Sequence, residues 1–403
     1  MMKTIQIIVA FFIGVIAHAQ SLEDYVAIAI KNNSNIKVAQ ANLALTQEKI
    51  HEVANLDNTN FSLGIFATTP ETRVGSQLFK AGVAQKLPWF GEFKTKRQAV
   101  EALAETKKYA VSLSEKQIAF EVKKAYYAIY QQKAITAILK ADKQVLQTYK
   151  AMALAALSNN RATMSDVLRI QVQINELHRT IYQNKNSIAS MDANFNRLLQ
   201  REESLPVQVP DSLHISSVLV QKESVNEHPS VLQLEKMDSV YNLQKKLITI
   251  DQKPKISLGL DYILVNKRPV ENLAFNGKDI WMPKFSLAIP IFNKKYSSQY
   301  KQIRIRQAAL EASVINQKNT LEIALEQALL DFDNKLLSLE AAQQNKKEIQ
   351  QAIAVDLKGY QTGILDYDKI LRLQLQKIKY ELEEIEAIKK TFIAKAKVEY
   401  LTE

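Results

Sequence analysis

An internal repeat of about 200 residues is the feature of this sequence that most limits how the chain can fold. Matching segments follow one another in the same order and at a nearly constant spacing. They are Ser62-Leu63-Gly64 with Ser257-Leu258-Gly259, Leu87-Pro88 with Ile289-Pro290, and Leu168-Arg169-Ile170 with Leu371-Arg372-Leu373. The sequence therefore predicts two copies of one structural unit, at residues 20–205 and 223–403, joined by a linker at 206–222.

Long helices are predicted in both copies by the absence of glycine and proline. Neither residue occurs between Gly91 and Pro206, between Pro290 and Gly359, or after Gly363. The gaps are rich in Ala, Leu, Gln, Glu and Lys, which favour helices. We expect one uninterrupted helix of ~65 residues in each copy, about 100 Å long. The helical runs are 93–203 and 294–402, each broken once, and shorter helices are expected at 35–55 and 230–252.

Each helical run is interrupted at an equivalent position. The first break contains Asn160, and the second extends from Gly359 to Gly363 and includes Tyr360. Asparagine and glycine tolerate the left-handed backbone conformation that ends a helix. We therefore expect a helix–helix turn at Asn160 and another at Gly363, with the flanking helices antiparallel.

A β-hairpin is expected ahead of the long helix in each copy. Apolar residues alternate with small or polar ones along residues 61–65 and 256–262, which is the two-residue period of a strand. Each of these strands requires a partner, and a second strand-like segment follows each one after a polar loop. The expected partners are residues 78–87 and 282–291, and the complete hairpins span 59–90 and 254–292.

The N-terminal residues have the pattern of a secretory signal peptide. Lys3 is followed by an apolar run from Ile5 to Ile16, and Ala17-His18-Ala19 is a small-residue cleavage motif. The run is shorter than the ~20 residues that span a bilayer. We expect residues 1–19 to be removed, so that the exported chain begins at Gln20. The sequence contains no cysteine, which excludes disulfides and thiolate metal sites.

No pattern typical of an enzyme or of a cofactor site occurs in the sequence. It has no glycine-rich phosphate loop and no nucleophile elbow, and the histidines after residue 19 lack metal-ligand spacing. The formal charge of +11 is spread along helical faces without a basic run that interleaves aromatic residues. Nucleic-acid binding is therefore not expected, and neither are catalytic residues, a metal or a cofactor.

The order of elements and several short motifs resemble the TolC-like outer-membrane efflux protein family. The resemblance covers the whole mature chain, and the Leu-Pro-Trp-Phe-Gly turn is most similar to the heavy-metal or cation efflux branch. The family's strand-to-helix turn is resembled by Pro88-Trp89-Phe90-Gly91 and Pro290-Ile291-Phe292-Asn293. Its helix–helix turn is resembled by Tyr360-Gln361-Thr362-Gly363. Its helix starts are resembled by Asn33 to Ile36 and by Asn226-Glu227-His228-Pro229.

The resemblance implies a mainly α-helical protein with a transmembrane β-barrel portion. Three chains would each give four strands to a twelve-stranded barrel, set on a periplasmic barrel of helices. It also implies a passive exit duct in the outer membrane of a Gram-negative bacterium, reaching into the periplasm. Its partners would be a periplasmic adaptor and an inner-membrane pump of the RND type. Residues expected to face lipid are Phe61, Leu63, Ile65, Ile256, Leu258 and Leu260, and those expected to face the lumen are Ser62, Gly64, Ser257, Gly259 and Asp261.

The resemblance also points to the residues of a periplasmic gate. The family commonly has an acidic ring at this tip, whereas the corresponding residues here are Lys369 and Arg372. Asp166 is the repeat equivalent of Lys369, and Asp366 and Asp368 are close to it in sequence. We expect these five residues to form the gate, with Asp166 pairing with Lys369 or Arg372 to hold the tip shut.

Other functions remain open from the sequence. The exit duct of a protein-secretion system would have the same architecture, because its cargo is chosen by the partner. A soluble periplasmic coiled-coil scaffold or adaptor would also contain long helical hairpins. It would not, however, need alternating strands at matched places in both copies. An exported binding protein or enzyme is a third alternative.

Overall fold

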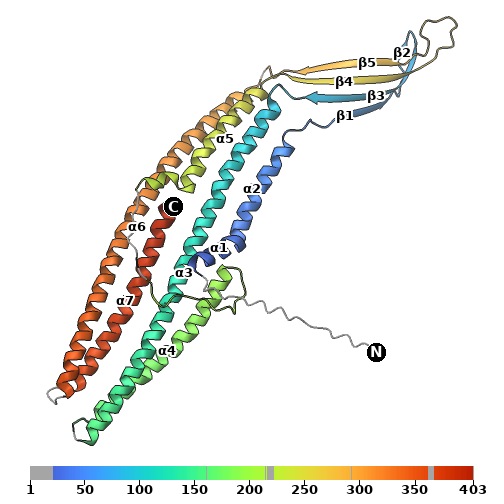
Figure 1. Cartoon of the computed structure of the whole chain (residues 1–403). Coiled ribbons are helices and arrows are strands. Elements are labelled where there is room, and N and C mark those ends of the chain that lie inside the picture. The colour runs from blue at the N-terminus through green and yellow to red at the C-terminus, as the bar shows by residue number, and fades with distance from the viewer. Residues whose placement is uncertain are drawn as a thin grey trace, which may run out of the picture. The chain divides into compact units, whose positions relative to one another are not determined.

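The computed structural model describes residues 21–159, 161–213, 215, 222–291, 293–361 and 367–402. The expected signal peptide at residues 1–19 lies outside the described residues. The described chain is mainly helical, with a small antiparallel sheet (Figure 1). Its helices are α1 (Leu22–Asn32), α2 (Ser34–Glu52), α3 (Glu92–Ser158), α4 (Met164–Leu198), the 3-10 helix η1 (Lys222–Glu227), α5 (Pro229–Asp251), α6 (Lys295–Gln361) and α7 (Tyr367–Thr402). Its strands are β1 (Asn60–Ile65), β2 (Glu71–Thr72), β3 (Gly75–Leu87), β4 (Lys255–Asn266) and β5 (Ile280–Ala288).

The long helices predicted from the sequence are confirmed. α3 and α6 each extend over 67 residues without interruption. The helices α2 and α5 lie close to the ranges predicted for the shorter helices, 35–55 and 230–252. The helices α4 and α7 lie in the predicted runs 93–203 and 294–402, after the break in each. Their amino-acid composition, rich in strong helix formers, is sufficient to predict these elements.

The first helix begins earlier than the sequence pattern predicts. α1 starts after Ser21, which forms a capping box with Asp24: Asp24 N donates to Ser21 Oγ (3.2 Å) and Ser21 N donates to Asp24 Oδ2 (2.8 Å). Asn33 then separates α1 from α2, and its side-chain oxygen accepts a hydrogen bond from Asn35 N (2.8 Å). The helix start expected at Asn35 therefore lies in the first turn of α2, and α1 is an additional element.

The chain divides into two compact units, and each unit contains parts of both sequence copies. We call the first the helical unit; it comprises Met1–Ile36, Glu115–Lys222 and Ile323–Glu403. We call the second the sheet unit; it comprises Lys37–Ser114 and Glu223–Glu322. The sequence repeat thus describes how the elements are ordered along the chain, whereas the compact units combine equivalent elements from the two copies.

In the sheet unit the two hairpins join into one antiparallel sheet with the order β1-β3-β4-β5 (Figure 1). The predicted pairs, β1 with β3 and β4 with β5, are confirmed, and β3 pairs with β4 between them. The short strand β2 lies in the first hairpin loop and pairs with the start of β3. β1 and β5 are the edge strands of the described sheet. β5 contains Pro283, and edge strands tolerate proline.

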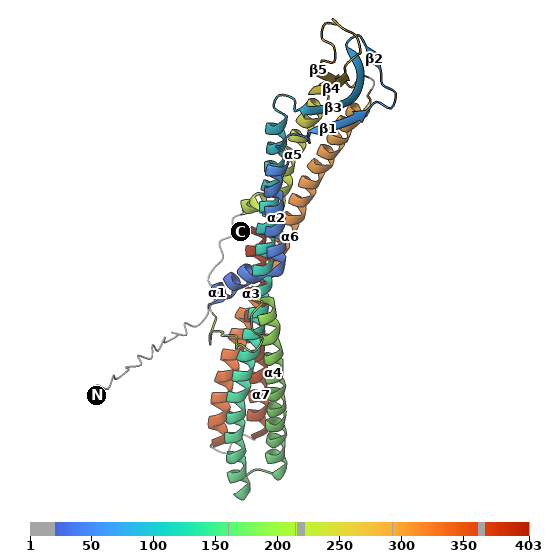
Figure 2. The ribbon, with the colours of Figure 1, turned by 90° about the vertical axis from the view of Figure 1, so that its right-hand side faces the viewer.

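In the helical unit, α4 runs antiparallel to α3, and α7 runs antiparallel to α6 (Figure 2). Leu146 of α3, Ile170 of α4 and Ile370 of α7 are fully buried in one apolar cluster. This cluster holds the helices of the two sequence copies together within the unit. Burial of each such side chain contributes about 1.5–3 kcal/mol relative to an exposed position.

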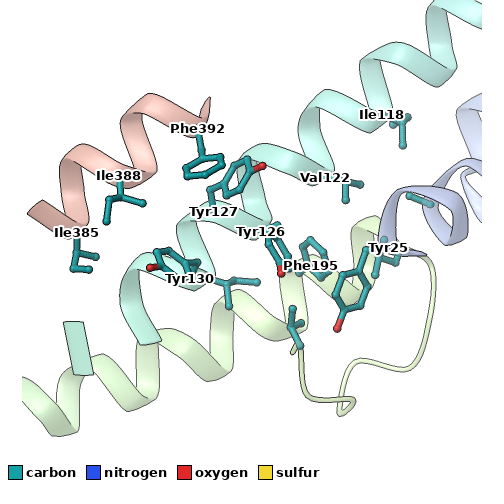
Figure 3. Close-up of a cluster of buried hydrophobic side chains, with 14 of the residues drawn as sticks. Tyr25, Ile118, Val122, Tyr126, Tyr127, Tyr130, Phe195, Ile385, Ile388 and Phe392 are labelled. Carbon is teal, nitrogen blue, oxygen red and sulfur yellow. The ribbon is translucent and has the colours of Figure 1, made fainter. Parts of the chain in front are cut away.

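Aromatic side chains form a second core of the helical unit, which attaches α1 to the longer helices. The ring of Tyr25 packs edge-on against Phe195 of α4, with centroids 5.2 Å apart, and lies 5.9 Å from Tyr126 of α3 (Figure 3). The Tyr25 hydroxyl accepts a hydrogen bond from Gln208 N (2.8 Å). The guanidinium group of Arg201 lies 4.9 Å above the Tyr25 ring. Tyr25 therefore connects α1 with α3, α4 and the linker.

A buried asparagine fixes the chain where it leaves α4. Asn196 is fully buried, and its side-chain nitrogen donates to the carbonyl oxygens of Glu203 (3.0 Å) and Leu205 (2.7 Å). Its side-chain oxygen accepts a hydrogen bond from Arg201 Nε (2.7 Å). These contacts satisfy backbone groups that no helix or strand pairs, so the chain is held at the start of the linker.

Candidate functional site: the two faces of the sheet and the helical tip

One face of the sheet is apolar and exposed. In β1 the side chains of Phe61, Leu63 and Ile65 are 80%, 78% and 83% exposed. Residues that lie opposite one another in neighbouring strands project from the same face. The register therefore adds further exposed apolar side chains to this face, namely Leu258, Trp281, Phe285 and Leu287. A contiguous exposed apolar patch marks a surface that contacts a partner or a membrane.

The opposite face of the sheet is polar. The register places serines, glycines, lysines and one aspartate on it, with Ser62 opposite Gly82 and Gly82 opposite Asp261. All six residues expected to face outward lie on the apolar face, and all five expected to face inward lie on the polar face. The polar face contains Ser62, Gly64, Lys80, Gly82, Lys86, Lys255, Ser257, Gly259, Asp261, Lys284 and Ser286, together with alanines and the larger apolar residues Ile263, Ile280 and Met282.

A three-residue ion cluster crosses the polar face. Asp261 of β4 pairs with Lys80 of β3 at 2.6 Å and with Lys284 of β5 at 2.5 Å. The Asp261 side chain has no exposed surface. The alternation of β4 predicts Asp261 on this face, but its two lysine partners depend on the strand register, which short sequence patterns do not reveal.

The first strand-to-helix turn, Pro88 to Gly91, ends in a buried carboxylate. Gly91 has a φ of +79°, a conformation that glycine adopts without strain. The Glu92 side chain accepts a hydrogen bond from Trp89 N (3.0 Å) and pairs with Lys96 (2.8 Å). Burial tends to raise the pKa of Glu92, but the hydrogen bonds from Lys96 and Trp89 outweigh it and hold that pKa below 4.5. An ionised Glu92 is thus fixed at the start of α3.

The second strand-to-helix turn follows Pro290 and has a different cap. The side-chain oxygen of Asn293 accepts a hydrogen bond from Lys295 N (2.9 Å), in the first turn of α6. Phe292, within the same motif, lies outside the described residues. The two turns therefore occupy equivalent places and share a proline. Glu92 is the first residue of α3, whereas Asn293 precedes α6 and caps its first turn.

The helix–helix turns are described only in part. Asn160, Gly363 and Asp366 lie outside the described residues, so their expected roles stay predictions. The break expected from Gly359 begins later, because α6 continues to Gln361. Tyr360 thus lies in the last turn of α6 and packs, partly buried, against the apolar cluster of Leu146, Ile170 and Ile370.

Asp166 caps α4 from within its own helix. Thr163 N (2.9 Å) and Thr163 Oγ1 (2.6 Å) both donate to the Asp166 carboxylate, and Asp166 N donates to Thr163 Oγ1 (3.3 Å). The side-chain hydrogen bond from Thr163, followed by its backbone N–H, lowers the pKa of Asp166 below 3.8. Within the described residues, Asp166 makes no ion pair with Lys369 or Arg372, and the expected pairing stays a prediction.

Among the described residues of the tip, Asp368 forms two ion pairs. Arg169 of α4 approaches it at 3.3 Å, and Arg372 pairs with it from the next turn of α7. Arg169 and Arg372 occupy equivalent positions in the two sequence copies. The repeat therefore contains a signal for Arg169, which the sequence reasoning did not use. Lys369 and Arg372 are both exposed.

A buried polar cluster joins α3 to α7 in the helical unit. Asp142 is 1% exposed; it accepts a hydrogen bond from Gln374 Nε2 (3.0 Å) and pairs with Lys377 (2.9 Å). Lys377 also pairs with Glu381 (2.8 Å), and burial raises the pKa of Glu381. Asp142 lies 232 residues before Gln374, so no local pattern in the sequence predicts this cluster.

No metal site is found in the part of the chain that the structure describes, where no three His, Asp or Glu side chains are grouped to hold an ion. His228 instead caps α5, because its Nδ1 accepts a hydrogen bond from Ser230 N (3.3 Å). None of the described helices combines the length and the hydropathy needed to cross a membrane.

Comparison with known proteins finds similar structures but no matching protein family or curated sequence. The sequence matches no protein-family model and no curated protein. The structure is similar to CusC, whose structures concern folding and transmembrane channel formation, with 15% identity over 94% of this chain and 91% of that one and a TM-score of 0.75. It is also similar to the open state of the MtrE outer membrane channel of Neisseria gonorrhoeae (15% identity, 95% and 89% covered, TM-score 0.73). A third match is the CmeC outer membrane channel of Campylobacter jejuni (12% identity, 94% and 85% covered, TM-score 0.70).

These similarities extend over nearly the whole chain in each case, and at such low identity they establish the fold. The overall arrangement of the long helices and the antiparallel sheet is thus similar to that of solved outer-membrane channels. The coarser part of the expected fold is confirmed: this chain is mainly helical with a small antiparallel sheet, and its fold is that of the TolC-like channel proteins. The twelve-stranded barrel and the trimer stay predictions.

Proposed function

We propose that this chain is one subunit of a trimeric outer-membrane exit duct, a passive channel for solutes that an inner-membrane transporter exports. The observation that carries the proposal is the sheet, which has an exposed apolar face, a polar face and two free edges. A soluble scaffold would gain nothing from an exposed row such as Phe61, Leu63 and Ile65. In a membrane the same row contacts lipid, and the polar face lines water.

The need for more than one chain follows from hydrogen bonding, and the number three from the resemblance to the TolC-like family. Backbone groups within lipid must be paired inside the protein, and the single sheet leaves the outer edges of β1 and β5 without a strand partner. Pairing β5 of one chain with β1 of the next removes these edges. Three chains that each contribute β1, β3, β4 and β5 would give a twelve-stranded barrel, an even number as in other bacterial outer-membrane barrels.

The strand-to-helix turns fit the boundary between lipid and water. Phe90 is 89% exposed, and Trp89 lies beside it with ring centroids 6.0 Å apart. Aromatic side chains are enriched at membrane interfaces, and the turns after Pro88 and Pro290 are the points at which the strands end. We place these turns at the periplasmic surface of the outer membrane, with the helices extending into the periplasm.

The partners proposed for the duct are a periplasmic adaptor and an inner-membrane pump of the RND type. A passive duct needs such partners because the sequence contains no nucleotide-binding motif that could supply energy. The signal-peptide pattern of residues 1–19 and the fold shared with CusC, MtrE and CmeC support this assignment. In this role the chain has no catalytic residues.

The helical tip is the proposed gate. Asp368 already joins α4 to α7 through Arg169 and pairs with Arg372, and Asp166, Lys369 and Asp366 lie nearby in sequence. Exposed ion pairs of this kind contribute only about 0–1 kcal/mol each. A trimer would repeat each pair three times, which is enough to bias a gate with two states of similar free energy.

The proposal is tested by purifying the mature chain, residues 20–403, with and without detergent. We expect the protein to require detergent, to be trimeric by light scattering, and to produce discrete conductance steps in planar lipid bilayers. A chain that remains monomeric and soluble without detergent would contradict the proposal and favour the periplasmic scaffold.

A further inference from the structure

The polar face of the sheet carries an excess of positive charge. Two of its lysines are matched by acidic residues outside the strands, since Lys86 pairs with Asp57 at 2.7 Å and Lys255 with Asp251 at 3.0 Å. The middle of the face keeps two lysines for one carboxylate. The charged residues that β1, β3, β4 and β5 place on this face are Lys80, Lys86, Lys255, Lys284 and Asp261.

The single carboxylate is covered by the two ammonium groups. The side chain of Asp261 is 0% exposed, whereas the side chains of Lys80 and Lys284 are 36% and 42% exposed. Each Nζ atom contacts a different oxygen of Asp261. A solute that moves along this face therefore meets ammonium groups, and the negative charge lies beneath them.

The neighbouring strands leave space for this arrangement. Gly82 lies directly opposite Asp261, and a Cβ atom added at Gly82 would come within 2.5 Å of Asp261 Oδ1 and 2.7 Å of Ser62 Oγ. A larger residue at this position would displace the carboxylate from beneath Lys80 and Lys284. The cluster is thus fitted to the strands around it and differs from a chance contact between mobile surface side chains.

We propose that the polar face makes the duct selective for anionic solutes, with Lys80 and Lys284 as the specificity-determining residues. This inference rests on the proposed function, in which the polar face lines the lumen. A trimer would then surround the lumen with six of these ammonium groups and three covered carboxylates. Rings of charged side chains set the ion preference of a pore, and a surface of one sign concentrates ions of the other.

The experiment measures reversal potentials of the trimer in planar bilayers that separate two KCl concentrations. We expect the permeability of chloride to exceed that of potassium by a factor on the order of two to five. The triple variant K80Q/D261N/K284Q removes one net positive charge per chain and leaves no buried charge unpaired. Its permeability ratio should fall close to one, while that of Lys284→Glu should fall below one.

A matched control removes the same net charge elsewhere. Lys318 lies in α6 and pairs with Glu235 of α5 at 2.8 Å, so Lys318→Gln should keep the wild-type permeability ratio. If the cluster only braces the sheet, the triple variant would be less stable but equally selective, and that result would overturn the inference. A wild-type pore that prefers potassium would overturn it as well, while the proposed function would stand. If no pore forms, both fail.

Discussion

The helical unit and the sheet unit treat their large apolar side chains in opposite ways. In the helical unit Tyr25, Leu146 and Phe195 are almost completely buried within one chain, whereas in the sheet unit Phe61, Leu63 and Ile65 are mostly exposed. The helical unit therefore has a core within one chain, although other large apolar side chains, such as Leu337 and Val355, stay exposed on its surface. The sheet is stable only with something against its apolar face, which lipid provides in the proposed duct.

The largest effect is expected from placing a charge on the apolar face. A lysine at the middle of the bilayer destabilises a membrane barrel by about 2–4 kcal/mol. In the proposed trimer, each of the three chains would be destabilised by this amount. Leu63→Lys should abolish insertion into membranes without lowering helical content, measured by membrane fractionation and far-ultraviolet circular dichroism. Gly64→Lys is the matched control, because Gly64 lies on the polar face with open space around its Cβ position. Equal loss of insertion in both variants would contradict the assignment of the two faces.

The core of the helical unit should respond to truncation by losing stability. Phe195 is 1% exposed and packs against Tyr25, so Phe195→Ala should lower the free energy of unfolding by about 3–5 kcal/mol. Phe90→Ala, at an exposed position, should change it by less than about 0.5 kcal/mol in detergent. Denaturant titration followed by circular dichroism measures both. Similar losses would mean that the two units do not differ in the way described.

A smaller loss is expected at the start of the linker. Asn196→Ala removes the side chain that bonds to the carbonyl oxygens of Glu203 and Leu205. Each of these hydrogen bonds contributes about 0.5–1.5 kcal/mol to the free energy of unfolding. The variant should unfold at lower denaturant concentration and expose the linker to limited proteolysis. Asn194→Ala, a nearby substitution on the exposed surface, should do neither.

The smallest effect concerns the cap of α4 and depends on pH. Thr163→Ala should lower the free energy of unfolding by about 1 kcal/mol at neutral pH. The pKa of Asp166 is lowered in the folded chain, so its ionised form stabilises the fold above the unfolded pKa of about 3.9. That stabilisation is lost as the pH falls through the lower, folded pKa.

The difference between Thr163→Ala and the wild type should therefore shrink as the pH falls below about 4. Thermal unfolding measured between neutral and acidic pH tests this. Thr180→Ala, within α4, removes a hydroxyl that bonds only to the carbonyl oxygen of Glu176 (2.9 Å), and its effect should not vary with pH. A pH-independent effect of Thr163→Ala would show that the Asp166 carboxylate does not contribute through its charge.

Local patterns were sufficient to predict the long helices and the strands. Composition determines where α3 and α6 continue without interruption, and alternation identifies β1 and β4. The same alternation assigns Phe61 and Ser62 to opposite faces. α1 was not predicted, because it follows directly after the predicted cleavage site. Ser21 and Asp24 nevertheless have the spacing of a capping box.

Contacts between distant segments were not predictable in the same way. The pairing of Lys80 and Lys284 with Asp261 requires the β3–β4 and β4–β5 registers, and the contact of Asp142 with Lys377 requires α3 to pack against α7. At the tip, Asp166 follows Thr163 by three residues, which is the spacing of a capping box. Its carboxylate accepts hydrogen bonds from Thr163, although it was expected to pair with Lys369 or Arg372. Local hydrogen bonds therefore compete with the pairings that a repeat suggests.

Pro283 has a consequence for the chain before it assembles. An uncovered edge strand is a template on which any extended segment can aggregate, and β5 is such a strand until a neighbour arrives. Proline has no backbone N–H to donate to a neighbouring strand. At Pro283 this weakens the ladder formed by an aggregating segment and, in the proposed duct, the ladder formed by the neighbouring chain alike.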